Sequence, residues 1–209
     1  MQDLIILGTG IHAAEMADIV DRINCQSPTW RLLGHVAHPK AQPSGEFFGR
    51  PVLGHLDCLD AYPGARVVAD NEFPRDIQVD ASRWTTLVDP SCFVHTSAQL
   101  GPGTVLYPGC FVGARARLGF RFFSLSQSTI NHDDVTGDHV VCASGVLLAG
   151  VVTVGDYVYL GQGCTVRQFL KLGRNCLIGM GAVVVRDVDP DAVMAGNPAR
   201  KMKDRVKVP

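Results

Sequence analysis

Charged residues are scarce in this 209-residue chain. Asp, Glu, Lys and Arg make up 19% of it, against roughly 25% in an average globular chain, and they balance to a net charge of −1. This balance gives no electrostatic reason to expect a nucleic acid or a membrane surface as a partner. The sequence also lacks a run of about 18 apolar residues, and its first residues, MQDLIILGTG, carry no basic leader. We therefore expect a cytoplasmic protein with neither a membrane-spanning helix nor a signal peptide.

Cysteine occurs seven times, an odd number, and never with the Cys-x-x-Cys spacing. This usage indicates reduced thiols in a cytoplasmic protein rather than a disulfide framework. The length suits one large domain or two small ones, and either buries enough core to need no disulfide or metal for stability.

Glycine, in contrast, is abundant, with 22 residues where ~7% of a chain is usual. Much of it belongs to a repeat. Counting in sixes from Val88 to Val184 reaches seventeen positions, of which fourteen are Val, Leu or Ile. The next residue is glycine at Gly101, Gly113, Gly119, Gly137, Gly155, Gly161, Gly173 and Gly179. Small side chains recur four residues after the aliphatic position, at Cys92, Ala98, Thr104, Cys110, Ala116, Ser128, Cys164, Cys176 and Ala182.

This hexapeptide repeat predicts an all-β prism over residues 81–209, which end in a basic tail. Each six residues form one short strand and one corner, and three strands close a coil that stacks on the next at about 4.8 Å. The aliphatic and small side chains point inward, and we expect the repeated glycine to ease the backbone of the corner. Five cysteines fall on inward positions, and we interpret them as small buried core residues rather than redox or metal groups: Cys92, Cys110, Cys142, Cys164 and Cys176.

Residues 1–80 predict a small Rossmann-like α/β domain with helices on a parallel sheet. The pattern places strands at residues 3–7, 31–36 and 66–69, a helix from Ala13 to Ile23, a short helix at 56–62, and a loop rich in proline and glycine at 39–50.

The first strand ends in Gly8-Thr9-Gly10, a pattern that cradles phosphate groups at the start of a helix. A dinucleotide fold would place an acidic residue at the end of the second strand, where this chain has Ala37-His38, so an NAD site is disfavoured. Two interpretations stay open: a mononucleotide or sugar-nucleotide site, and a tight turn that needs glycine for packing.

The repeat is least regular between residues 118 and 136, where Phe122 and Asp134 take small inward positions. Local departures of this kind tend to accompany function. The same stretch holds His132 and Asp133. Histidine accepts protons near neutral pH, and an adjoining carboxylate can orient it. We interpret His132 as a candidate general base, the alternative being a solvated corner histidine.

These motifs resemble the sugar O-acyl/N-acyltransferase family of the NeuD/PglD type. The resemblance covers nearly the whole chain and is closest at Ile130-Asn131-His132-Asp133, Ala149-Gly150-Val151, Ile178-Gly179-Met180-Gly181-Ala182 and Gly196-Asn197-Pro198-Ala199-Arg200. It implies a left-handed β-helix that forms a homotrimer. It also implies acetyl-coenzyme A as co-substrate, bound between neighbouring prisms, no metal, and a sugar or nucleotide-sugar acceptor.

The resemblance also implies roles for individual residues. His132 would be the general base and Asp133 the carboxylate that polarises it, while backbone amides near Gly150 would hold the oxyanion and contact pantetheine. Coenzyme A would pass Gly161, Gly179 and Ala182. The nucleotide part of the acceptor would lie at Gly8, Gly10, His12 and Asn71.

The chain departs from the family pattern at several positions. A pair of acids is replaced by Ala37-His38, an asparagine by Leu125, and a second histidine by Val141, with His139 displaced by two. These departures leave open the sugar and nucleotide, the choice between an amine and a hydroxyl acceptor, and an acyl group other than acetyl. The roles of Asp134 and His139 are open as well.

We expect an acetyl-coenzyme A dependent N-acetyltransferase of a nucleotide-linked sugar. The alternatives are O-acetylation of a sialic-acid-like sugar and a non-catalytic scaffold that binds sugar nucleotides. A metal enzyme resembling the gamma carbonic anhydrases is disfavoured, because His95, His132 and His139 differ in their place within the repeat.

The end of the chain carries a basic tail. Arg200, Lys201, Lys203, Arg205 and Lys207 face a single acid, Asp204. This tail either meets the phosphates of coenzyme A or is a solvated terminus.

Overall fold

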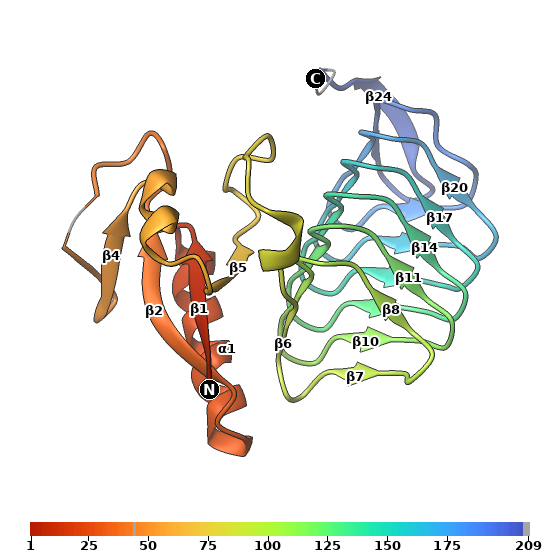
Figure 1. Ribbon diagram of the computed structural model, residues 1–209. Helices are drawn as coiled ribbons and strands as arrows, with labels where there is room; N and C mark the ends of the chain where they lie inside the picture. The colour runs from red at the N-terminus through yellow and green to blue at the C-terminus, as the bar shows by residue number, and fades with distance from the viewer. Residues whose placement is uncertain (44, 207–209) are drawn as a thin grey trace. The chain divides into compact units, whose positions relative to one another are not determined.

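The computed structural model describes residues 1–43 and 45–206 (Figure 1). The chain divides into two compact units, Met1–Pro90 and Ser91–Pro209, and each is described by itself. Lys207, part of the expected basic tail, lies outside the described residues.

The first unit is a small sheet with one α-helix. Its elements are β1 (Gln2–Leu7), α1 (Ile11–Gln26), β2 (Trp30–Val36), β3 (Glu46–Phe47), β4 (Arg50–Gly54), the 3-10 helix η1 (Leu56–Ala61), β5 (Arg66–Ala69), the 3-10 helix η2 (Ala81–Arg83) and β6 (Leu87–Val88). The sheet order is β3-β4-β2-β1-β5, in which β4, β2, β1 and β5 run parallel and β3 is antiparallel to β4. The buried side chains of α1 and of β1 form the core of this unit.

The expected strands β1, β2 and β5 and the helix α1 are confirmed, whereas the expected loop over 39–50 was wrong in part. Glu46 and Phe47 pair with Pro51 and Arg50 across a turn at Phe48 and Gly49, both of which have positive φ. Such a turn is most readily recognised from Asn-Gly or Asp-Gly, and Phe-Gly carries a weaker signal. The Rossmann-like expectation is not confirmed beyond a small, mainly parallel sheet with one α-helix.

The second unit is a left-handed parallel β-helix built on the predicted repeat (Figure 1). Its strands are β7 (Phe93–Val94), β8 (Gln99–Leu100), β9 (Val105–Leu106), β10 (Phe111–Val112), β11 (Arg117–Leu118), β12 (Phe123–Ser124), β13 (Thr129–Ile130), β14 (Val135–Thr136), β15 (Val141–Cys142), β16 (Leu147–Leu148), β17 (Thr153–Val154), β18 (Tyr159–Leu160), β19 (Thr165–Val166), β20 (Lys171–Leu172), β21 (Leu177–Ile178), β22 (Val183–Val184), β23 (Ala192–Ala195) and β24 (Arg200–Asp204). From β7 to β22 every strand is two residues long, and its second residue is the position counted in sixes.

The strands stack into three faces of parallel strands, ordered β22-β19-β16-β13-β10-β7, β20-β17-β14-β11-β8 and, on the third face, β23-β21-β18-β15-β12-β9 with β24 antiparallel at the end. Each residue pairs with the one 18 positions later, as Phe93 does with Phe111 and Phe111 with Thr129. This register confirms three strands per coil.

The interior of the β-helix is filled by the two inward positions of the repeat. Every aliphatic-phase residue from Leu106 to Val184 is buried, including the irregular Ser124 and Thr136. Of the five cysteines assigned to the core, Cys110, Cys142, Cys164 and Cys176 are buried, whereas Cys92 is half-buried. None of the seven cysteines forms a disulfide, and all lie within the described residues.

The repeated glycines have a different purpose from the one expected. They do not have positive φ; the left-handed conformation falls two residues later, mostly on residues with side chains, such as Arg115, Arg121 and Tyr157. A side chain on these glycines would strike the backbone of the next coil, as at Gly155, whose added Cβ would lie 2.6 Å from Arg174 N. Glycine is therefore required for the close approach of coils, not for the corner itself.

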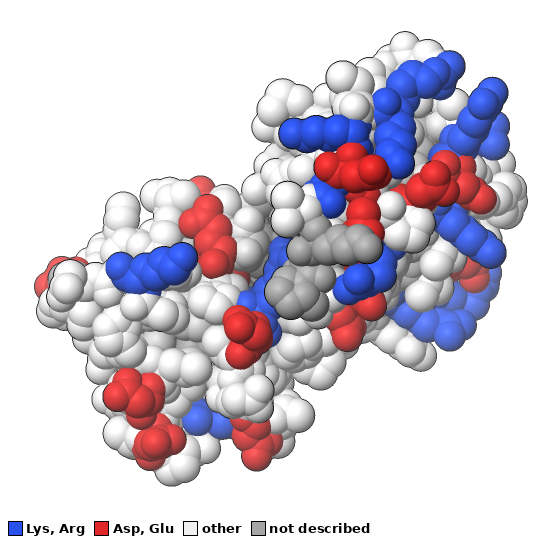
Figure 2. All heavy atoms as spheres, turned by 90° about the horizontal axis from the view of Figure 1, so that it is seen from above, with Lys and Arg blue, Asp and Glu red and all other residues white. Residues whose placement is uncertain are grey.

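The C-terminal segment closes the β-helix. β24 pairs antiparallel with β23, Lys201 forms an ion pair with Asp204 (2.7 Å), and Arg205 donates to the carbonyl oxygens of Tyr157 and Cys176. Basic side chains on this unit are interspersed with acidic ones (Figure 2). The described part of the expected basic tail is thus an edge strand with fixed contacts. In the described residues, no helix has the length and apolar character that crossing a bilayer requires.

Replacing Gly155 by alanine should destabilise the protein by about 3 kcal/mol, because the methyl group overlaps the next coil. Gly163→Ala is the matched control: Gly163 has a φ of +66°, but an added Cβ meets no heavy atom within 4 Å. We expect it to cost about 1 kcal/mol, for the left-handed backbone alone. Urea denaturation followed by circular dichroism measures both losses, and equal losses would contradict the coil-contact explanation.

Candidate active site

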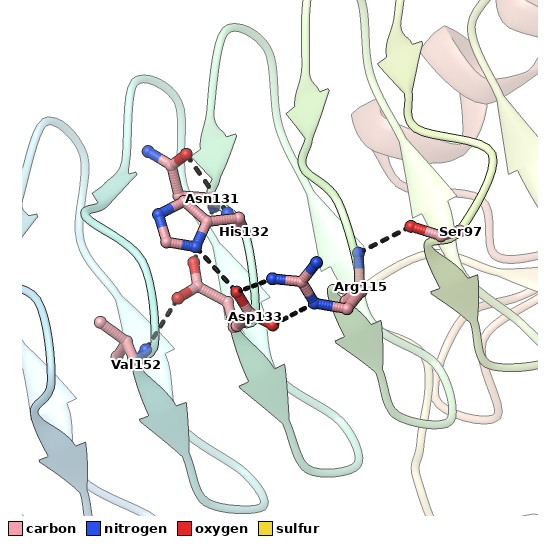
Figure 3. Close-up of polar contacts among 7 residues, drawn as sticks. Ser97, Arg115, Asn131, His132, Asp133 and Val152 are labelled. Atoms are coloured by element: carbon pink, nitrogen blue, oxygen red, sulfur yellow. Dashed lines mark hydrogen bonds and ion pairs between the residues drawn. The ribbon is translucent and has the colours of Figure 1, made fainter.

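The irregular part of the repeat forms one corner of the β-helix, between β13 and β14, where Asn131, His132, Asp133 and Asp134 follow one another (Figure 3). The corner of the preceding coil, residues 113–116, lies on one side of it. The corner of the following coil, residues 149–152, lies on the other. Three stacked corners therefore surround His132.

The His132 ring is hydrogen-bonded to the adjoining carboxylate, with 2.8 Å between Nδ1 and Asp133 Oδ2 (Figure 3). A carboxylate only accepts hydrogen bonds, so Nδ1 carries the proton and Nε2 presents a lone pair. The side chain of His132 is 54% exposed, so this lone pair is accessible from outside the coil. The arrangement is chemically suited to accepting a proton from a bound molecule.

Arg115, on the preceding coil, is a site residue that the sequence analysis missed. Its Nε donates to Asp133 Oδ1 at 2.6 Å and its Nη2 to Asp133 Oδ2 at 2.7 Å (Figure 3). The Arg115 guanidinium, and after it the His132 ring, lower the pKa of Asp133 to about 2, so this carboxylate is ionised at neutral pH. Arg115 precedes Asp133 by 18 residues, the separation at which side chains meet on neighbouring coils, and that rule could have identified it.

Asp134 lies beneath the corner, in an inward position where the repeat places a small residue. It is fully buried, and its carboxylate accepts from the backbone N–H of Asn131 (2.7 Å) and of Val152 (2.8 Å). Burial raises the pKa of Asp134 to about 6. Asp134 thus joins the His132 corner to the following corner through two backbone hydrogen bonds.

Gly150, on the following coil, lies directly against the His132 ring. It has a φ of +99°, and an added Cβ would come within 3.0 Å of His132 Nε2. The next residue, Val151, donates its N–H to the His132 carbonyl oxygen (3.0 Å). Among the described residues, no acceptor takes the N–H of Gly150. The structure therefore brings together His132, Asp133 and Gly150.

A second group of expected residues lines a pocket at another corner of the coils. Its volume is about 340 Å³, and its lining comprises Leu125, Ala143, Ser144, Tyr159, Gly161, Gln162, Leu177, Ile178, Gly179 and Met180. Gly161 and Gly179 are thus brought together, next to Leu125, one of the departures from the family pattern. Ala182 is fully buried and its side chain faces the interior of the coil.

The first unit has a pocket of about 280 Å³ lined by Gly8, Thr9, Gly10, His38, Lys40, Ala41, Asp70 and Glu72. A side chain at Gly8 would overlap the Asp70 carboxylate, so packing explains this glycine, as the tight-turn interpretation requires. Asp70 is buried, which raises its pKa. The expected residues His12 and Asn71 do not line the pocket, but Asn71 lies between two residues that do. Its side-chain oxygen is buried and has no hydrogen-bond partner among the described residues.

His139 lies at a different corner from His132. It is buried and its ring stacks on that of Tyr157, with 5.2 Å between centroids and 7° between planes. Val141 is buried on β15. Within residues 1–43 and 45–206, no three His, Cys, Asp or Glu side chains are grouped as metal ligands would be.

Comparison with known proteins shows similarity to acyltransferases. No protein-family model matches the chain. Over 150 residues it is 31% identical to the acyl-[acyl-carrier-protein]–UDP-N-acetylglucosamine O-acyltransferase of Sinorhizobium fredii. The aligned residues make up 72% of this chain and 52% of the relative. The corresponding enzyme of Agrobacterium fabrum is 31% identical over 125 residues, 60% of this chain and 44% of that relative. The chain thus spans about half the length of these curated relatives.

Two solved structures share the fold over nearly the whole chain. The acetyltransferase domain of PglB from Neisseria gonorrhoeae, in complex with acetyl coenzyme A, has a TM-score of 0.85 at 25% identity and covers 96% of this chain and 99% of its own. A mutant GDP-perosamine N-acetyl transferase from Caulobacter crescentus, in complex with CoA and GDP-perosamine, has a TM-score of 0.84 at 22% identity over 98% of each chain.

The raised pKa of Asp134 predicts a pH-dependent contribution to stability. The folded protein holds this proton more tightly than the unfolded chain, whose pKa is near 3.8. The stability that protonated Asp134 contributes is therefore complete below pH 3.8 and is lost as pH rises through about 6. Relative to Asp134→Asn, the free energy of unfolding of the wild type should fall by about 3 kcal/mol across this pH window. Urea denaturation at a series of pH values measures this, with Asp18→Asn, on the exposed side of α1, as the control. A difference between wild type and Asp134→Asn that does not vary with pH would contradict the prediction.

Proposed function

Because the chain is related in sequence and fold to the hexapeptide-repeat acyltransferases, we propose that it transfers an acetyl group from coenzyme A to the amino group of a nucleotide-linked sugar. The observation that carries this proposal is the His132–Asp133 hydrogen bond, in a ring whose Nε2 lies against Gly150 of the following coil. The N–H of Gly150 has no acceptor among the described residues. A base and an oxyanion donor are the two groups that acyl transfer requires.

His132 acts as the general base. Its Nε2 removes a proton from the acceptor amine as the nitrogen attacks the thioester carbonyl, and the imidazolium that forms is stabilised by ionised Asp133. When the carbon–sulfur bond breaks, the thiolate of coenzyme A leaves and takes up the proton that His132 holds. The charge on the carbonyl oxygen is met by the N–H of Gly150, which points at no other acceptor among the described residues.

Coenzyme A is proposed to bind along the pocket that contains Gly161 and Gly179. The absence of side chains at these positions leaves room for an extended ligand, and Ser144 and Gln162 offer polar groups among apolar neighbours. The similar acetyltransferase domain of PglB holds acetyl coenzyme A. A homotrimer, in which coenzyme A lies between neighbouring β-helices, is part of the proposal.

The pocket of the first unit is proposed to bind the nucleotide part of the acceptor. It opens at the start of α1, where no side chain caps the helix and the first turn has no acidic residue, so the backbone N–H groups are available to phosphate. Lys40 lines the same pocket and supplies a positive charge.

O-acylation is the second candidate. The curated relatives with 31% identity are O-acyltransferases that act on UDP-N-acetylglucosamine. The same base serves a hydroxyl acceptor, because it withdraws the proton as the oxygen attacks.

Replacing His132 by alanine should lower kcat about 100- to 10,000-fold, because the base is lost. His132 is largely exposed, so the fold and the thermal stability should be unchanged. His95→Ala, which removes a half-buried histidine at an earlier corner, is the matched control. Release of the coenzyme A thiol in the presence of nucleotide-linked amino sugars measures the rate. Near-normal turnover by His132→Ala would exclude His132 as the base.

Ligand binding should raise the melting temperature, since a ligand that binds the folded state stabilises it. We expect a shift with coenzyme A and a separate shift with a nucleotide sugar. Lys40→Ala should weaken only the shift caused by the nucleotide sugar. A screen of UDP, GDP and dTDP sugars with and without coenzyme A also identifies the acceptor. A shift with nucleotide sugars and none with coenzyme A would favour a non-catalytic scaffold instead.

A further inference from the structure

Arg115 extends the His132–Asp133 pair by a third member. Its two donors occupy both oxygens of the Asp133 carboxylate, and Asp133 Oδ2 also receives the Nδ1–H of His132 at 2.8 Å (Figure 3). We propose that Arg115 is a positioning residue, which fixes the Asp133 carboxylate in the orientation that His132 needs. This inference rests on the proposed role of His132 as the base.

The Arg115–Asp133 ion pair orients the Asp133 carboxylate rather than stabilising the fold. The Arg115 side chain is 67% exposed, and exposed ion pairs contribute little to the stability of a fold. The planar fork of a guanidinium nevertheless sets the direction of a carboxylate that it binds through both oxygens. Asp133 lies at a corner with positive φ, and within residues 1–43 and 45–206 its carboxylate is bound by Arg115 and His132 alone. Arg115 therefore determines where Asp133 Oδ2 lies relative to His132 Nδ1.

The test compares Arg115→Gln and Arg115→Lys with the wild type, and Arg117→Gln serves as the matched control. Arg117 lies two residues further along the same coil, is exposed, and forms no ion pair among the described residues. Two readouts are measured: kcat and KM, and the NMR signal of the His132 Nδ1–H, which Asp133 accepts, in histidine-labelled protein. The NMR signal needs no substrate and no activity.

Arg115→Gln should lower kcat about tenfold, as loss of an orienting partner does, with KM changed less than about twofold. The Nδ1–H signal of His132 should move or broaden, because the Asp133 carboxylate is no longer held through both oxygens. Arg115→Lys should recover kcat only in part, since it restores the charge but not the fork. Arg117→Gln should match the wild type in both readouts.

A kcat and a His132 Nδ1–H signal of Arg115→Gln that match those of Arg117→Gln would overturn the inference. If His132→Ala is inactive in the same assays, the proposed function survives that result. Conversely, a changed His132 signal in a protein that transfers no acyl group would overturn the proposed function and leave the effect of Arg115 on Asp133 and His132 standing.

Discussion

The close stacking of one coil on the next is the constraint on which the rest of the second unit depends. From β7 to β19 each strand pairs with the strand 18 residues later, and the corner backbones follow the same register. The spacing is set by backbone hydrogen bonds, and it leaves no room for a side chain at the repeated glycines. The left-handed corner positions do accept side chains, and two of them, Arg115 and Asp133, make the contacts of the His132 corner.

The candidate active site is one column of that stack. Arg115 lies one coil before Asp133, Gly150 one coil after His132, and Val152 one coil after Asp134. The register therefore brings together a cation, a histidine with its carboxylate, and a glycine from segments of different coils. Asp134 breaks the inward pattern, but its two backbone hydrogen bonds compensate in part for the cost of burying a carboxylate.

Prediction from the sequence succeeded where the information was local or periodic. The period of six identified the strands from β7 to β22, and the adjacency of His132 and Asp133 indicated the contact between their side chains. Prediction failed where the surroundings of a residue are supplied by segments distant in the sequence. The glycines were assigned to corner conformation because the approach of the next coil is invisible in one repeat. Arg115 was missed because its partner Asp133 lies 18 residues away on the next coil, and the hairpin at Phe48–Gly49 because its turn residues are atypical.

The sequence by itself determined the architecture of the second unit, since a strict alternation of inward and outward residues leaves one way to bury the aliphatic side chains. It also determined which corner is exceptional, because there a carboxylate, that of Asp134, takes an inward position. The tertiary structure alone decided the chemistry of that corner. Ionisation of Asp133, burial of Asp134 and the approach of Gly150 to the His132 ring all depend on groups of neighbouring coils, and those groups meet only when the chain has wound past them.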